Sequence, residues 1–145
     1  MRHWLRNIPL PQPHLVALGA GIGLGLLVTW ELPLPSWVRS AGLCTIAAGL
    51  ALITWATYAS TRTHLANPDL LVTTGPYAVS RNPMYVGWTL VYCGLTSMLA
   101  SVWLALLLPA VLVATHLTVR REERRLRARF GSAYTAYAAA VRRYV

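Results

Sequence analysis

The feature that most constrains this chain is a long stretch without charge. Residues 82–119 contain no Asp, Glu, Lys or Arg, and an arginine stands at each end, Arg81 and Arg120. A helix needs about 20 predominantly apolar residues to cross the hydrocarbon core of a bilayer, so this stretch is long enough for two crossings. A chain that crosses and returns brings Arg81 back to the same membrane surface as Glu122 and Glu123.

The composition favours lipid as the surrounding solvent. Hydrophobic residues make up 56% of the chain and charged residues only 12%, with a mean hydropathy of +0.48, whereas soluble domains usually carry about 25% charged residues. The net charge of +9 raises the question of nucleic acid. Because the arginines flank apolar segments, anionic lipid headgroups are the expected counter-surface. We therefore expect membrane lipids as partners and no nucleic acid.

The apolar segments predict an all-α membrane protein, a single domain over residues 1–145 with about four transmembrane helices and a C-terminal helical segment at the cytosolic interface. The expected spans cover residues 15–30, 40–61, 83–98 and 101–119, and the expected C-terminal helices cover residues 119–130 and 132–143. Alternating prolines predict an extended lead over residues 1–14. Four glycines in the first span (Gly19, Gly21, Gly23 and Gly25) predict close helix packing there and make a homo-oligomer an open possibility.

The arginine distribution predicts the orientation. With four spans, twelve of the thirteen arginines fall on one side and Arg39 alone falls on the other. Cytoplasmic segments are the ones enriched in Lys and Arg, so both termini are expected in the cytoplasm. The expected location is the bacterial inner membrane, as a multi-pass protein.

The start of the third span is the first candidate site. Asn is a favoured N-cap and Pro a favoured first helical residue, so Asn82 and Pro83 are expected to begin that helix. A helix N-terminus also suits a carboxylate or phosphate, and Arg81 would strengthen such an anion site. The alternative for Arg81 is an ordinary flanking arginine on the cytoplasmic side.

The two glutamates are the second candidate. Both lie among arginines three and four residues away, which is typical of a solvated ion-pair network. They also follow the fourth span within about a turn, where an unpaired carboxylate is costly. His116, Arg120 and Glu123 are spaced to share one helix face, although an isolated histidine such as His116 is more often simply packed. No set of His, Cys and carboxylates has metal-ligand spacing, so no metal is expected.

Aromatic residues could line such a site or lie at the membrane interface. Tyr85 shares a helix face with Trp88 and Tyr92, and Tyr134 and Tyr137 belong to a stripe near the C-terminus. Interfacial aromatics are usually belt residues, so stacking on a purine is the minority interpretation from spacing alone.

Taken together, the motifs resemble one family. Gly75-Pro-Tyr77, Arg81-Asn-Pro-Met-Tyr85, Gly87, Glu122-Glu-Arg-Arg-Leu126, Phe130-Gly131, Tyr134 and Tyr137 are similar in order and spacing to the isoprenylcysteine carboxyl methyltransferase and phospholipid methyltransferase superfamily. The likeness covers roughly residues 74–144. It implies an integral-membrane methyltransferase that uses S-adenosylmethionine at the cytosolic face. The implied acceptor is lipophilic: a prenylcysteine-like or other apolar carboxylate, or a lipid amine.

The resemblance, together with the helix positions described above, leads us to expect roles for individual residues. Those expected for catalysis are Arg81, Asn82, Arg120 and Glu123. Those expected for cofactor binding are Tyr77, Arg81, Asn82, Pro83, Tyr85, His116, Glu122, Glu123, Tyr134 and Tyr137. One departure stands out, because the family histidine is Asn82 here, and an amide can hydrogen-bond but cannot titrate.

Three other functions fit the sequence. A small four-span transporter would need a membrane-embedded carboxylate, for which Glu31 is the candidate. A sterol-type membrane reductase would bind NADPH in place of S-adenosylmethionine. A non-catalytic lipid-binding relative would be consistent with Asn82.

Overall fold

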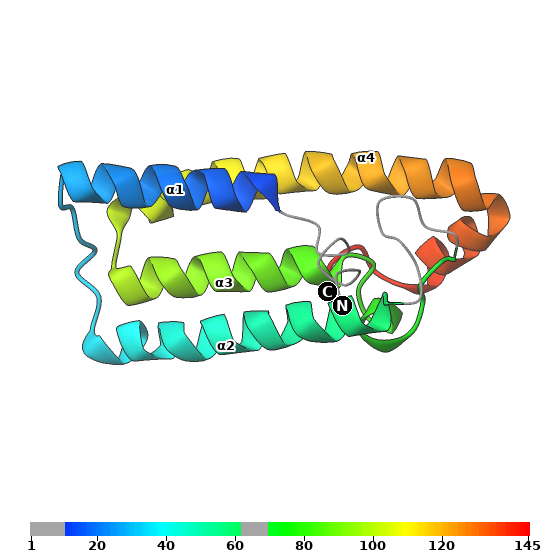
Figure 1. Ribbon diagram of the computed structural model, residues 1–145, viewed down its shortest axis with the longest axis horizontal. Coiled ribbons are helices and arrows are strands. Elements are labelled where there is room, and N and C mark those ends of the chain that lie inside the picture. Colours follow the sequence, from blue (N-terminus) through cyan, green and yellow to red (C-terminus); the bar gives the residue numbers. More distant parts are fainter. Residues whose placement is uncertain (1–10, 62–69) are drawn as a thin grey trace.

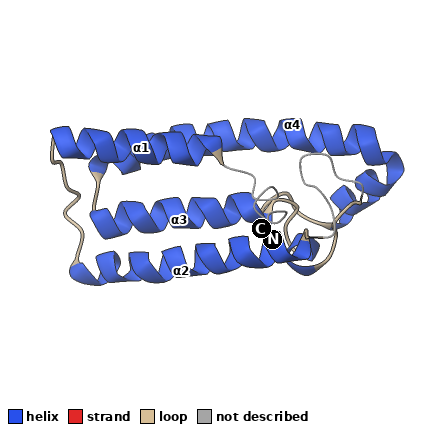
Figure 2. Cartoon of the chain, in the orientation of Figure 1, coloured by secondary structure: helices blue, strands red, loops and turns tan. Residues whose placement is uncertain are grey.

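The chain forms a bundle of long helices. The structure, a computed structural model, describes residues 11–61 and 70–145. Its elements are α1 (Gln12–Leu27), α2 (Ser36–Ala59), the 3-10 turn η2 (Gly75–Ala78), α3 (Pro83–Leu99) and α4 (Val102–Ala140). The helices run in two layers, α1 beside α4 and α2 beside α3 (Figures 1 and 2). Within these two ranges there is no strand, only isolated bridges between Glu31 and Ser101 and between Ser80 and Arg142. The all-helical prediction is confirmed.

Two of the described helices, α2 and α4, are long and apolar enough to cross a membrane. Only 28% of the apolar window is buried in each, whereas a core helix of a soluble protein would be mostly buried. The other two helices have 16 and 17 residues, which is about 24 to 26 Å of helix against a hydrocarbon core of about 30 Å. Four crossings therefore stay a prediction, and the two long helices indicate association with a membrane.

Helix boundaries differ from the expected spans where proline acts. The first helix begins at Gln12 and ends at Leu27, three residues earlier at each end than expected. It can begin early because Pro13 fits the first helical turn, where its missing N–H is not needed. The second begins directly after Pro35 and ends at Ala59, and the third is close to expectation. Most of the predicted extended lead, over residues 1–10, lies outside the described residues. Residues 67–69, whose Asn-Pro-Asp sequence predicts a turn, also lie outside them.

Paired glycines bring α2 and α3 into backbone contact. A Cβ on Gly49 would lie 2.6 Å from the carbonyl oxygen of Gly87, and a Cβ on Gly42 would lie 2.7 Å from that of Gly94. Each pair is reciprocal, because a Cβ on Gly87 would lie 2.9 Å from the Gly49 oxygen. The absence of side chains at these four positions is what allows the two helices to approach so closely.

The prediction that the four glycines of the first span pack closely is wrong for most of them. A Cβ on Gly19 or Gly23 would meet nothing within 4 Å, and one on Gly25 would only just reach Trp103, at 4.0 Å; Gly21 packs closely, against Leu104. Residues two apart on a helix are separated by about 200°, so alternate glycines do not line one face.

The fourth helix extends beyond its apolar part. It is apolar to Val119 and then carries the arginines and glutamates, and Gly131 interrupts it with φ 54 and ψ −122. This kink, which confirms the predicted break, turns the chain back toward the start of α3 (Figure 1). The returning part ends at Ala140 and not at residue 143, because Val141 is extended.

Candidate functional site

The site lies at the end of the bundle where α3 begins. Gly75 adopts a positive φ of 62, and the following turn buries Pro76 and Tyr77 before the chain reaches Asn82. The prediction that Asn82 and Pro83 start the helix is confirmed. The Asn82 side chain makes no capping hydrogen bond, however, because its amide is engaged elsewhere in the site.

Glu123 is the centre of the charged cluster, which we define as Arg81, Asn82, Glu123 and Arg143. Arg81 Nη2 lies 3.3 Å from Glu123 Oε1, and both side chains are 11% exposed. Arg143 donates to Glu123 Oε2 from Nε at 3.0 Å and from Nη2 at 2.9 Å. The Asn82 amide donates to Oε1 at 3.4 Å. The predicted meeting of Arg81 with this glutamate is confirmed, and the carboxylate is held by charge-assisted hydrogen bonds to both of its oxygens.

The C-terminal segment, residues 141–145, closes over this cluster. The Arg81 N–H donates to the Arg142 carbonyl at 2.9 Å, and the Asn82 amide donates to the Arg143 carbonyl at 3.1 Å. Farther along, the Tyr144 hydroxyl and His116 Nδ1 are 3.1 Å apart. The last five residues therefore connect the start of α3 to the middle of α4.

Sequence reasoning assigned no site role to Arg143. It lies twenty residues from Glu123, beyond the Gly131 kink, so no helical spacing relates the two side chains. The pairing depends on the direction in which the kink turns the chain, and the sequence carries no signal for that direction.

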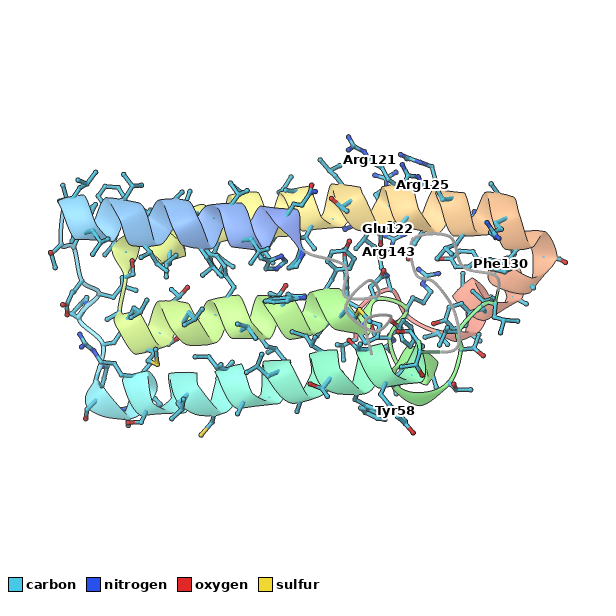
Figure 3. All side chains as sticks on the ribbon, viewed as in Figure 1. Tyr58, Arg121, Glu122, Arg125, Phe130 and Arg143 are labelled. Carbon is cyan, nitrogen blue, oxygen red and sulfur yellow. The ribbon has the colours of Figure 1, made fainter. Side chains whose placement is uncertain are left out.

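Glu122 lies in a different environment from Glu123. The Tyr85 hydroxyl donates a hydrogen bond to Glu122 Oε1 at 2.9 Å. Burial raises the pKa of Glu122, and the Tyr85 hydrogen bond and Arg125 oppose that shift. Figure 3 shows Glu122 and Arg143 between α3 and α4, while Arg121 and Arg125 point away from the bundle. The site therefore holds one carboxylate paired with cations and one beside a neutral phenol.

Tyrosines form the wall of the site next to the cluster. Tyr134 is 1% exposed and meets Tyr137 edge-on, with ring centroids 6.1 Å apart. The Tyr137 hydroxyl donates to the Tyr77 carbonyl at 2.7 Å, and burial raises the pKa of Tyr137 to about 12. The Tyr134 hydroxyl and Arg81 Nε are buried without a hydrogen-bond partner among the described residues. Buried donors are normally satisfied, so these two are available to a bound molecule.

Most of the candidate residues come together. Those near the start of α3 or on the facing part of α4 are Tyr77, Arg81, Asn82, Pro83, Tyr85, Glu122, Glu123, Tyr134 and Tyr137, with His116 joined to them through Tyr144. Arg120 is exposed and is not part of the cluster. Over the described ranges, no three His, Cys, Asp or Glu side chains gather as metal ligands would. The roles assigned to these residues stay predictions.

A known family matches much of the chain. The profile of a family described as phospholipid methyltransferase matches residues 37–133, which is more than half of the chain. The matched region includes α2, α3, the turn before α3 and α4 as far as the Gly131 kink, and so it contains both glutamates. A search of curated proteins finds no match.

Proposed function

Because the chain belongs to the phospholipid methyltransferase family, we propose that it is an integral-membrane enzyme that transfers a methyl group from S-adenosylmethionine to a lipophilic acceptor. The acceptor would be a lipid amine or an apolar carboxylate, such as that of a prenylcysteine-like molecule, presented at the cytosolic membrane face. Methyltransferase chemistry on lipid-type substrates follows from the family. The cofactor, the acceptor, the number of crossings and the cytoplasmic placement of both termini are the parts that we propose.

The observation that carries the proposal is the largely buried charged cluster at the start of α3. Two guanidinium groups and a carboxylate meet there, with a second carboxylate and buried tyrosines beside them. The amino-acid end of S-adenosylmethionine carries a carboxylate and an ammonium group, and its other end carries a ribose and a purine. The donor set of the site fits those groups.

Each side chain has a proposed role in binding. Arg81, whose Nε is buried without a partner among the described residues, would hold the cofactor carboxylate together with Arg143. Glu122 would accept from the ammonium group or the ribose hydroxyls, since the oxygens of Glu123 already have partners. Tyr134 and Tyr137 would lie against the purine. When bound, the cofactor supplies an electrophilic methyl group on a sulfonium.

The contribution of the protein would be alignment and the exclusion of water. Holding two reactants in attack geometry can supply about 7 to 11 kcal/mol of a barrier. The C-terminal segment contacts the cluster through the Arg142 and Arg143 carbonyls, and in the proposed orientation it would cover the cluster from the aqueous side. Asn82 would act as a hydrogen-bonding group that joins this segment to Glu123, a role in which an amide can replace the family histidine.

The transporter alternative has less support. Glu31 is exposed and pairs with Arg39 at 2.6 Å, in the connection between α1 and α2. Glu31 lies outside the helices and already has a cationic partner, so it is not the embedded, substrate-coupled carboxylate that such a transporter needs.

The test is ligand binding by the full chain in lipid nanodiscs. S-adenosylhomocysteine should raise the melting temperature and NADPH should not, because a ligand specific to the native state stabilises it by about 2.7 kcal/mol at a hundred times its Kd. Transfer of a labelled methyl group from S-adenosylmethionine into extracted lipid would then identify the acceptor class.

The matched variants are Arg81→Ala and Arg121→Ala. Both remove one arginine, but Arg121 points away from the bundle (Figure 3). Arg81→Ala should lower the affinity for S-adenosylhomocysteine at least tenfold, and Arg121→Ala should leave it unchanged. A well-folded wild-type protein that binds no S-adenosylhomocysteine would refute the proposed function.

A further inference from the structure

The part of α4 that follows its apolar residues presents arginines to the outside of the molecule. Four exposed residues form this arginine face: Arg120, Arg121, Arg124 and Arg125. At about 100° per residue, their side chains leave the helix within a sector of about 140°, and those of Glu122 and Glu123 leave it outside that sector. Figure 3 shows Arg121 and Arg125 pointing away from the bundle. The arginine face therefore lies outside the charged cluster and needs a separate explanation.

The chain has too few acidic side chains to neutralise the arginine face. It contains thirteen arginines and four acidic residues. Glu31 has an arginine partner of its own, and Glu123 already pairs with two arginines of the charged cluster. Glu122 is directed into the bundle, where it accepts a hydrogen bond from a tyrosine. Asp69, outside the described residues, is the one acidic side chain left. Most of the countercharge therefore has to come from another molecule.

Aromatic residues locate the arginine face relative to the membrane. Trp37 and Tyr58 lie near opposite ends of α2 and are 70% and 77% exposed. About 32 Å of helix separates them, which is close to the thickness of the hydrocarbon core, about 30 Å. Exposed Trp and Tyr residues are enriched at the two membrane–water interfaces. Figure 3 shows Tyr58 and Arg121 at about the same level along the bundle, on opposite sides of it. The arginine face therefore begins where the hydrocarbon core ends.

The course of α4 gives the same depth. Its apolar part, residues 102–119, is about 27 Å long, and Arg120 follows directly. The φ and ψ values stay helical as far as Gly131, so the arginines stand on a direct extension of the apolar part. From residue 120 to residue 125 the helix rises about 8 Å, and the headgroup region of one leaflet is about 5 to 8 Å thick. With the apolar part in the hydrocarbon core, the arginine face spans one headgroup layer.

We propose that the arginine face binds the phosphate groups of anionic phospholipids and prefers these lipids to zwitterionic ones. A guanidinium group can hold a phosphate through two parallel N–H donors, and four such groups lie within two helical turns here. An anionic headgroup supplies the countercharge that the chain lacks, whereas a zwitterionic headgroup brings a cation of its own. The bound lipid is a resident partner of α4 and not the methyl acceptor. The inference goes beyond the proposed function and does not depend on it.

Lipid retention measures the proposed contact directly. The full chain in detergent is offered equal amounts of phosphatidylglycerol and phosphatidylcholine, and native mass spectrometry counts the lipids that remain bound. The wild type should retain phosphatidylglycerol in preference. The double variant Arg121→Gln, Arg125→Gln should reduce that preference by roughly fivefold for each arginine. The double variant Arg121→Lys, Arg125→Lys, which keeps both charges, should retain most of it.

The matched control is Arg39→Gln, which removes an arginine from the first turn of α2, at the other end of the bundle. It should leave the preference for phosphatidylglycerol unchanged. Equal retention of the two lipids by the wild type would overturn the inference, and so would an unchanged preference in the double glutamine variant.

Melting temperatures in nanodiscs identify which anion the arginine face binds. Adding phosphatidylglycerol to phosphatidylcholine nanodiscs should raise the melting temperature of the wild type, because a ligand of the native state stabilises it. High salt should weaken this rise, since it screens exposed charges. Inorganic phosphate or a short RNA, added to nanodiscs of phosphatidylcholine alone, should not produce it. An equal rise with phosphate would indicate a site for free anions, and one with RNA a nucleic-acid surface; either would overturn the inference.

Binding of S-adenosylhomocysteine by the wild type keeps this inference apart from the proposed function. A wild-type protein that binds S-adenosylhomocysteine but retains both lipids equally would overturn the lipid inference and leave the methyltransferase assignment intact. A wild-type protein that prefers phosphatidylglycerol but binds no S-adenosylhomocysteine would refute the proposed function and support the arginine face as a lipid-binding surface.

Discussion

Replacing Glu123 with glutamine should destabilise the fold far more than the same change at the neighbouring Glu122. The carboxylate of Glu123 pairs with Arg81 and Arg143. Removing one partner of a buried ion pair typically costs about 3 to 5 kcal/mol, because a charge is left buried without compensation. Arg81 meets that description at 11% exposure, whereas Arg143 is 36% exposed and can be solvated.

The lower end of that range is therefore expected for Glu123→Gln, about 3 kcal/mol, since the new amide oxygen can still accept one hydrogen bond. Glu122→Gln keeps an oxygen for the Tyr85 hydroxyl and removes a carboxylate that burial disfavours. A neutral hydrogen bond contributes only about 1 kcal/mol, so this variant should change stability by no more than that.

The pH dependence separates the two glutamates further. Burial raises the folded pKa of Glu122 above its ordinary value of 4.5, so the folded chain binds this proton more tightly than the unfolded chain. The stability that comes from this tighter proton binding is present below pH 4.5 and is lost as the pH rises through the raised pKa of Glu122 in the folded chain. Glu122→Gln should remove this component.

The assay is unfolding of both variants in the same mixed micelles, followed by circular dichroism, with S-adenosylhomocysteine binding measured well below the melting temperature. Glu123→Gln should lose both stability and binding. Equal stability of the two variants at neutral pH would refute the view that Glu123 holds the cluster together, and so would a greater loss in Glu122→Gln.

Three further predictions concern packing and the C-terminal segment. Gly49→Ala should cost about 1 to 3 kcal/mol, because its Cβ would collide with the facing helix backbone. Gly23→Ala, whose Cβ meets nothing, should leave stability unchanged or raise it slightly in the same unfolding assay. Arg143→Ala should speed hydrogen exchange across residues 141–145, measured by mass spectrometry, and unchanged exchange would contradict the pairing with Glu123. His116→Phe and Tyr144→Phe should each lower the free energy of unfolding by about 1 kcal/mol, because each removes the same hydrogen bond. The double variant should lose no more than either single variant, and additive losses would contradict that bond.

The meeting of Arg81 with Glu123 could be predicted because the uncharged interval between them is long enough for two helices that run out and back. The Gly131 kink could also be predicted, since glycine tolerates a positive φ at little cost. The partnership of Glu123 with Arg143 could not, because it depends on the direction of the kink and on contacts made by the last five residues.

Glycine content alone misidentified the tightly packed helices. The sequence shows four glycines in α1 and only two each in α2 and α3, yet the close backbone contacts are made by the glycines of α2 and α3. What matters is a seven-residue separation, Gly42 to Gly49 facing Gly87 to Gly94, which returns each glycine to the same side of its helix. Asn82 begins α3 as predicted, but its side chain bonds Glu123 and the Arg143 carbonyl and does not cap the helix.

The glycine contacts between α2 and α3 also divide the molecule mechanically. Two helices whose backbones touch cannot separate or slide without losing the whole seam, so they form a stiff half. By contrast α1 packs mainly against α4, and this second pair of helices meets α3 at few places. A lipid tail that enters the bundle would therefore be expected to pass between the two pairs and leave the stiff half, with the start of α3 and its arginine, in place.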